Sequence, residues 1–196
     1  MLTNEFGYMK SIRQFLLSLL MATVCLTSHE DEKWLTYKFT SHKNKTINAK
    51  ALLGKYVIVN FTYTDCVMYC TTQTQQLKNL RSRLVNEVPN KYIQFISISL
   101  MPDRDNPKSL NGFAKRFSLE DAQDWQFVTA NPVQIAKLKN SLGVQVAFGN
   151  EPNQFNHSTK VYLFDTHGQM VETFDGIPIE DERIIKKINA LEENTI

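Results

Sequence analysis

Two cysteines four residues apart, Cys66 and Cys70, are the residues of this sequence best suited to chemistry. They follow an apolar run at 56–61 and precede a segment with helical spacing, so we expect them where a helix begins. Unpaired backbone N–H groups and the positive end of the helix dipole favour thiolate over thiol at such a place. Positions four apart share one helix face, so both sulfurs could reach a single ion. Soft thiolates favour Cu(I) over hard cations, whereas structural zinc sites use four protein ligands and this sequence offers few.

The same pair of cysteines could instead serve redox chemistry or structure. A disulfide across so few residues closes almost no loop and would add little stability, which weakens the structural interpretation. In a thiol–disulfide oxidoreductase, Cys66 would be the nucleophile and Cys70 would resolve the mixed disulfide. Thioredoxin-type reductants use a shorter Cys-x-x-Cys spacing and place a proline before the strand that faces the dithiol. The residues directly before Val161 include His157 but no proline.

The N-terminal part of the chain has the pattern of a secretory signal. A basic flank precedes an apolar run at 15–27, and small and charged residues follow it. This pattern predicts a cleaved signal over residues 1–28 and one domain over 29–196. The run is shorter than the roughly 20 residues that span a bilayer, although a membrane anchor, or a lipid anchor on Cys25, stays an alternative. If the signal is removed, Cys66 and Cys70 are the cysteines that the mature chain keeps.

Composition agrees with one ordinary folded domain. Of the 196 residues, 42% are hydrophobic, which is enough to bury a core at this length. The net charge of +2 offers no electrostatic footprint for nucleic acid, so we predict no nucleic-acid partner.

The pattern of apolar residues predicts an α/β fold in which strands and helices alternate. Expected strands are 34–40, as part of an N-terminal hairpin or edge strand, 56–61, 92–99, 125–128, 160–165 and 169–174, and expected helices are 68–88, 107–117, 132–142 and 180–193. The last two strands flank Thr166-His167-Gly168, which is typical of a hairpin turn. This order predicts a central mixed sheet flanked by helices. A thioredoxin-like fold with an N-terminal β-hairpin extension satisfies it.

Four segments in order resemble the Sco/SenC family of copper chaperones and together cover about residues 50–180. They are Phe61-Thr62-Tyr63 leading to Cys66 and Cys70; Phe95–Ser99 with the Pro102–Pro107 turn; Trp125–Thr129 with Gly143-Val144; and Asn156-His157-Ser158 before Val161–Asp165. The resemblance implies that Cys66, Cys70 and His157 bind copper, as Cu(I), Cu(II) or both. Two thiolates and an imidazole suit Cu(I), and the imidazole helps to accommodate Cu(II).

The resemblance also implies partners and a compartment. Family members help to mature the copper centre of cytochrome c oxidase, so the expected partners are a copper-receiving oxidase subunit or another copper carrier, and a thiol–disulfide reductant. The expected location is extracytoplasmic, in the bacterial periplasm or at the outer face of the inner membrane, with a possible membrane tether.

The chain departs from the family pattern at three positions around the candidate site. Val67 and Met68 stand where the family usually has Pro and Asp, and Met101 stands where it usually has Asp. These changes either leave an apolar surface or create a softer site, because thioethers favour Cu(I). Loss of the carboxylates could alter docking to the partner that receives copper, so the sequence supports copper delivery to an oxidase less strongly than it supports copper binding. His167 is expected to be a solvated turn residue, and His42 matches nothing in the family.

Overall fold

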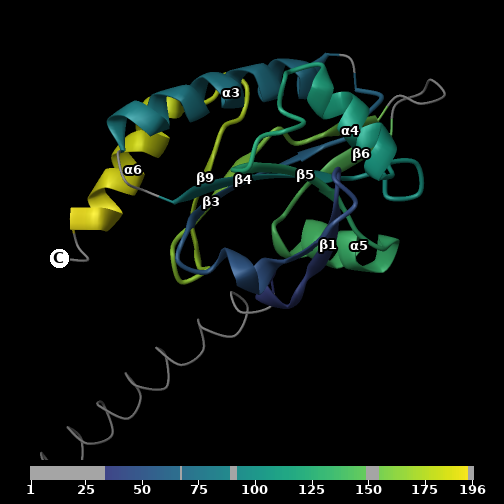
Figure 1. The fold of residues 1–196 in the computed structure, drawn as a ribbon, viewed down its shortest axis with the longest axis horizontal. Helices are drawn as coiled ribbons and strands as arrows, with labels where there is room; N and C mark the ends of the chain where they lie inside the picture. The colour runs from purple at the N-terminus through teal and green to yellow at the C-terminus, as the bar shows by residue number, and fades with distance from the viewer. Residues whose placement is uncertain (1–33, 67, 89–91, 149–154, 194–196) are drawn as a thin grey trace, which may run out of the picture.

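The computed structural model describes residues 34–66, 68–88, 92–148 and 155–193, which form a mixed sheet with helices on both faces (Figure 1). The seven-stranded sheet has the order β2-β1-β5-β4-β3-β8-β9. Its strands are β1 (Lys38–Ser41), β2 (Thr46–Asn48), β3 (Tyr56–Thr62), β4 (Ile93–Ser99), β5 (Trp125–Thr129), β8 (Val161–Phe164) and β9 (Met170–Phe174). The three central strands are parallel, and β8 pairs antiparallel with β3. The carboxyl ends of β3 and β4 therefore meet at one edge of the sheet.

Strand β3, an interior strand of the sheet, is buried at every residue. Its side chains alternate between the two faces, as a strand requires. Tyr56 and Ile58 belong to the core on one face, while Val57, Val59 and Phe61 belong to the core on the other. This explains why the strand reads as a continuous apolar run rather than an alternating one.

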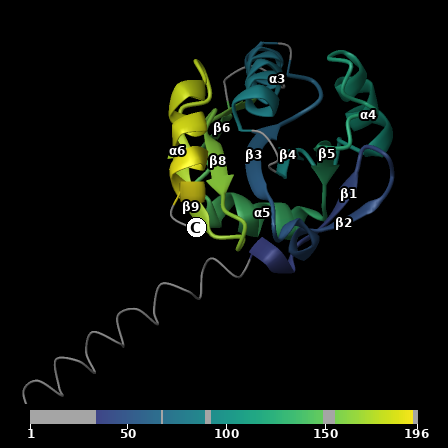
Figure 2. The same cartoon turned by 60° about the vertical axis from the view of Figure 1, so that its left-hand side comes forward.

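Helices cover the two faces unequally (Figures 1 and 2). Helices α3 (Tyr69–Glu87), α4 (Pro107–Lys115) and α6 (Asp181–Glu193) contribute to one core, and α5 (Pro132–Ser141) contributes to the other, with the short 3₁₀ helices η1 (Trp34–Thr36) and η2 (Ala49–Leu52). The heptad-like row Leu77, Leu80 and Leu84 is the face by which α3 packs on the sheet. None of the helices in the described ranges is long and apolar enough to cross a membrane.

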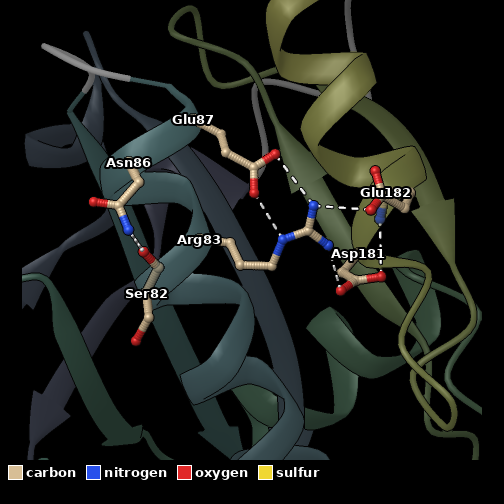
Figure 3. Close-up of polar contacts among 6 residues, drawn as sticks. All are labelled: Ser82, Arg83, Asn86, Glu87, Asp181 and Glu182. Carbon is tan, nitrogen blue, oxygen red and sulfur yellow. Dashed lines mark hydrogen bonds and ion pairs between the residues drawn. The ribbon is translucent and has the colours of Figure 1, made fainter.

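Arg83 ties α3 to the start of α6 (Figure 3). Its guanidinium donates to Asp181 at 2.7 Å and to Glu182 at 2.9 Å, and also to Glu87 one turn along its own helix at 2.8 Å. Single exposed ion pairs add little stability, but one arginine with three carboxylates fixes how the two helices meet.

Most predicted elements are confirmed, with bounds shifted by one or two residues. The prediction of strand from residue 34 was wrong at its start, because Trp34–Thr36 is a 3₁₀ helix and the strand begins at Lys38. The N-terminal hairpin is confirmed as β1 paired with β2. A second small hairpin, β6 (Val146–Phe148) with β7 (Phe155–His157), was not predicted. The predicted signal lies outside the described residues.

Candidate metal centre

Cys66 and Cys70 lie where β3 passes into α3, as predicted, but they do not share a helix face. Helix α3 begins at Tyr69, so Cys70 is in its first turn and Cys66 precedes it. The sulfur of Cys66 accepts the backbone N–H of Cys70 at 3.1 Å. That N–H is one of the first-turn donors without a partner inside the helix, so Cys66 replaces the side-chain oxygen of an ordinary N-cap. Both cysteines are buried, with 6% and 2% exposure, and both are free thiols.

This arrangement gives the two cysteines very different pKa values. The pKa of Cys66 is lowered to about 5, chiefly by the hydrogen bond from the Cys70 side chain, against the opposing effect of burial. The Cys70 N–H and the Tyr63 side chain also stabilise the thiolate. The pKa of Cys70 is raised, because its proton is shared with Cys66 and its sulfur is buried. At neutral pH the pair therefore carries one thiolate and one thiol.

His157 completes a set of three soft or borderline donors. It ends β7, and its Nε2 faces the sulfur of Cys70 at 3.7 Å. Its Nδ1 lies 2.9 Å from the carbonyl oxygen of Ser158, which can only accept, so Nδ1 carries the proton and Nε2 presents a lone pair. Burial lowers the pKa of the ring and keeps it neutral. Tyr63 packs edge-on against the imidazole, with 6.0 Å between ring centres.

The turn after β4 braces the cysteine loop. The carboxylate of Asp105, only 3% exposed, accepts the backbone N–H of Thr64 at 3.1 Å, its hydroxyl at 2.5 Å, and the hydroxyl of Ser99 at 2.6 Å. Arg116, the residue that caps the C-terminus of α4, donates to the carbonyl oxygen of Thr64 at 2.8 Å. The Asp105 contacts use the shared carboxyl edge of β3 and β4, so the sheet itself holds the loop in front of α3.

The structure brings Cys70 and His157 within reach of one another, with Cys66 against the Cys70 backbone. It does not close these groups into a preformed metal cage: within the described ranges, no set of three or more His, Cys, Asp or Glu residues is compact enough to hold an ion.

The remaining singled-out residues divide between surface and core. Met68 is 64% exposed beside the cysteines, whereas Met101 is half-buried against the apolar core on the α5 face. Val67 lies outside the described residues. His167 is confirmed as a solvated turn residue, with 76% of its side chain exposed. His42 is instead buried, with Nε2 on the carbonyl of Glu120 and Nδ1 accepting from Phe127 N–H.

Two polar residues near the site were missed by sequence reasoning. Asp105 appeared only as part of a turn, and Gln73 was not considered. Gln73 is 1% exposed and lies one turn beyond Cys70 on α3, where its side chain donates to the carbonyl of Thr159. A glutamine on the inner face of an amphipathic helix is the signal that could have drawn attention to it.

A thioredoxin-like domain with two cysteines at a strand–helix junction and a facing histidine is thus the class that the fold and the site define. The SCO1/SenC family model matches residues 27–193. The chain belongs to the SCO1/SenC family.

Individual relatives agree with this assignment. The chain is 25% identical over 144 residues to the SCO1 protein homolog of Bacillus subtilis, covering 72% of each chain. It is 28% identical to a SCO1/SenC family lipoprotein from Bacillus anthracis, with a TM-score of 0.72, covering 80% of this chain and 93% of that one. The fold also matches Arabidopsis thaliana ScoI, solved with copper bound, at 20% identity and a TM-score of 0.66, covering 79% and 96%.

Proposed function

We propose that this protein is a metallochaperone that binds copper through Cys66, Cys70 and His157. The observation that carries the proposal is the approach of His157 Nε2 to the Cys70 sulfur at 3.7 Å, from segments 87 residues apart. Membership of a family with a copper-bound relative supports it.

The chemistry of the donors fits copper as cargo. Two thiolates and a neutral imidazole suit Cu(I), and the imidazole also suits Cu(II). One cysteine is already ionised at neutral pH, so binding displaces a single thiol proton, from Cys70. The ligands lie close together but are not locked into a cage, which allows them to leave one at a time as an acceptor takes the ion.

We also propose a location and a recipient, on the ground of the family relatives. We place the protein outside the cytoplasm, with residues 1–28 as a signal or tether, because a related SCO1/SenC protein is a lipoprotein. The recipient is a copper-receiving cytochrome c oxidase subunit or another copper carrier, and a thiol–disulfide reductant keeps Cys66 and Cys70 reduced. Oxidation of the Cys66 thiolate and the Cys70 thiol to a disulfide would release two electrons and one proton to an oxidant and leave no thiolate for Cu(I).

A titration tests the proposal. Reduced protein is titrated with Cu(I) in competition with a chromophoric chelator and, separately, with Cu(II). We expect one ion per chain, with binding greatly weakened by Cys66→Ser, by Cys70→Ser and by His157→Ala. His167→Ala is the matched control, because that exposed ring lies in a turn beyond β8. Stoichiometric binding unaffected by the three substitutions would contradict the assignment.

The second candidate is a thiol–disulfide oxidoreductase, favoured by the low pKa of Cys66 beside a protonated, buried partner. The Cys66 thiolate would attack a substrate disulfide, form a mixed disulfide and expel one substrate thiolate. Cys70, once deprotonated, would then attack the Cys66 sulfur, form the Cys66–Cys70 disulfide and release the second substrate thiolate. Reduction of insulin by the reduced protein, together with failure to bind copper, would favour this function over the first.

A further inference from the structure

Four hydrogen bonds, three of them buried and the last part-buried, cross the sheet and end at the segment that carries His157. They run from Trp125 Nε1 to Ser97 Oγ (2.9 Å), from Ser97 Oγ to Asn60 Oδ1 (2.7 Å), from Asn60 Nδ2 to Gln73 Oε1 (3.0 Å) and from Gln73 Nε2 to the carbonyl oxygen of Thr159 (2.5 Å). We call these four side chains and the Thr159 carbonyl the polar relay. Its side chains are at most 2% exposed, so each unmade bond would be costly.

Both ends of the polar relay fix its direction. The indole N–H of Trp125 can only donate, and the peptide carbonyl of Thr159 can only accept. The hydroxyl of Ser97 and the amides of Asn60 and Gln73 therefore each have one orientation that satisfies both neighbours. Hydrogen bonds in such a chain strengthen one another in a low-dielectric interior. The hydrogen bond from Asn60 to Gln73 Oε1 thus orients the Gln73 amide so that its N–H₂ group donates to Thr159.

Helix α3 consequently contacts the histidine segment at two points. Cys70 and Gln73 are three residues apart and lie on one face of the helix. Cys70 faces His157, and Gln73 bonds to Thr159 two residues further along the segment. The segment is secured on its other side by the Ser158 N–H, which donates to the carbonyl of Gln145 at 2.9 Å.

Gly176 packs directly on the Gln73–Thr159 contact. A Cβ atom at this position would overlap both the Thr159 carbonyl oxygen and the Gln73 amide nitrogen. The segment after β9 thus lies against the hydrogen bond, and only a residue without a side chain fits. A polar contact packed this tightly sets the distance between α3 and the histidine segment.

We propose that Gln73 is a positioning residue for the metal centre, holding the His157 imidazole against Cys70 through the Thr159 carbonyl. The inference deepens the proposed function and rests on it. The polar side chains of Ser97, Asn60 and Gln73 lie in an apolar interior and would be unfavourable there unless every hydrogen-bonding group is paired. Apolar residues of the same size would fill the space with no polar group left to pair. Their pairing ends at a carbonyl two residues from a candidate ligand, where orientation matters more than stability.

The test compares Gln73→Met with the wild type and with Gln76→Met. Gln76 is the matched control because it lies one turn further on the same helix, where its side chain accepts the Ile179 N–H at 2.9 Å and does not contact Thr159. Cu(I) affinity of each reduced protein is measured by chelator competition, alone and in a His157→Ala background. Gln73→Glu serves as a second variant, because it keeps the shape and the acceptor for Asn60 but loses the donor to Thr159.

We expect Gln73→Met to weaken Cu(I) binding about tenfold in the wild-type background and to have no further effect once His157 is alanine. Gln76→Met should leave the affinity unchanged. In copper-free protein, the Ser158 amide should exchange with solvent faster in Gln73→Met and Gln73→Glu than in Gln76→Met.

Unchanged affinity and unchanged Ser158 exchange in the Gln73 variants, with only a lower melting temperature, would overturn the positioning role. An equal loss of affinity with and without the imidazole would overturn it too. If the wild type and His157→Ala bind copper equally, the proposed ligand set fails instead, and the amide exchange still decides whether Gln73 holds the segment.

Discussion

Replacing Cys70 with alanine should raise the pKa of the Cys66 thiol, because the Cys70 side chain is the main cause of its low value. In the wild type that pKa is about 5. A hydrogen bond to a charged group is worth about 1.5–3 kcal/mol, and 1.36 kcal/mol corresponds to one pH unit, so losing the thiol donor should raise the pKa by about 1 to 2. The remaining Cys70 N–H contact at 3.1 Å and the Tyr63 contact should prevent a full return to the ordinary cysteine value.

The assay is alkylation of reduced, metal-free protein by iodoacetamide over pH 4 to 9, with the Cys66 peptide quantified by mass spectrometry. The alkylation rate of Cys66 should reach half its maximum near pH 5 in the wild type, and at a pH about 1 to 2 units higher in Cys70→Ala. Cys70→Ser is the matched control, because its hydroxyl still donates and its midpoint should stay closer to that of the wild type. A wild-type midpoint near the ordinary value of about 8.5, or no difference between the two variants, would refute the reasoning.

Three further predictions concern stability, measured by urea unfolding of the reduced protein. Asp105→Ala should lower the free energy of unfolding by about 3 kcal/mol, because three donors lose a buried acceptor; a loss below about 1 kcal/mol would show that water replaces it. Burial lowers the pKa of His42, so the unfolded chain binds more protons below about pH 6.5 and stability falls as pH drops. His42→Gln should make that fall shallower than in the wild type, and an equal slope would contradict this. Gly168→Ala should cost about 1–2 kcal/mol, because φ is +79° and a Cβ would approach Leu35 to 2.7 Å. An unchanged midpoint would contradict this, because the strain at positive φ stays even if the side chain of Leu35 moves aside.

The elements that carry the site were predictable because their patterns are local. The apolar run of β3 and the leucine row of α3 place a strand–helix junction at Cys66 and Cys70 with no knowledge of the fold. The hairpin of β8 and β9 follows equally from Thr166-His167-Gly168 between two apolar segments. The prediction that the two cysteines share a helix face was wrong. Cys66 precedes the helix, and its sulfur accepts a backbone N–H of the first turn.

The contacts that support the site were not predictable from local pattern, because their partners are distant in sequence. Asn60 lies within an apolar strand, and nothing near it indicates a bond to Gln73 and, through Ser97, to Trp125. The partners of His42 were not predictable for the same reason, because they lie 78 and 85 residues away. A polar residue inside an apolar pattern indicates that a partner exists, but only the folded sheet shows which one it is.

The pairing of β8 with β3 has a consequence for the order in which ligands become available during folding. Cys66 and Cys70 lie on one continuous strand–helix segment, so no long loop has to close to bring them together. His157 lies just before β8, and β8 pairs with β3 across a long intervening stretch of chain. Contacts between such distant segments form late, because the entropy of closing the loop must be overcome first. If the proposed ligand set is correct, a chain that meets Cu(I) before it has finished folding would offer two sulfurs and no imidazole, and the histidine would join an ion already held by the cysteines.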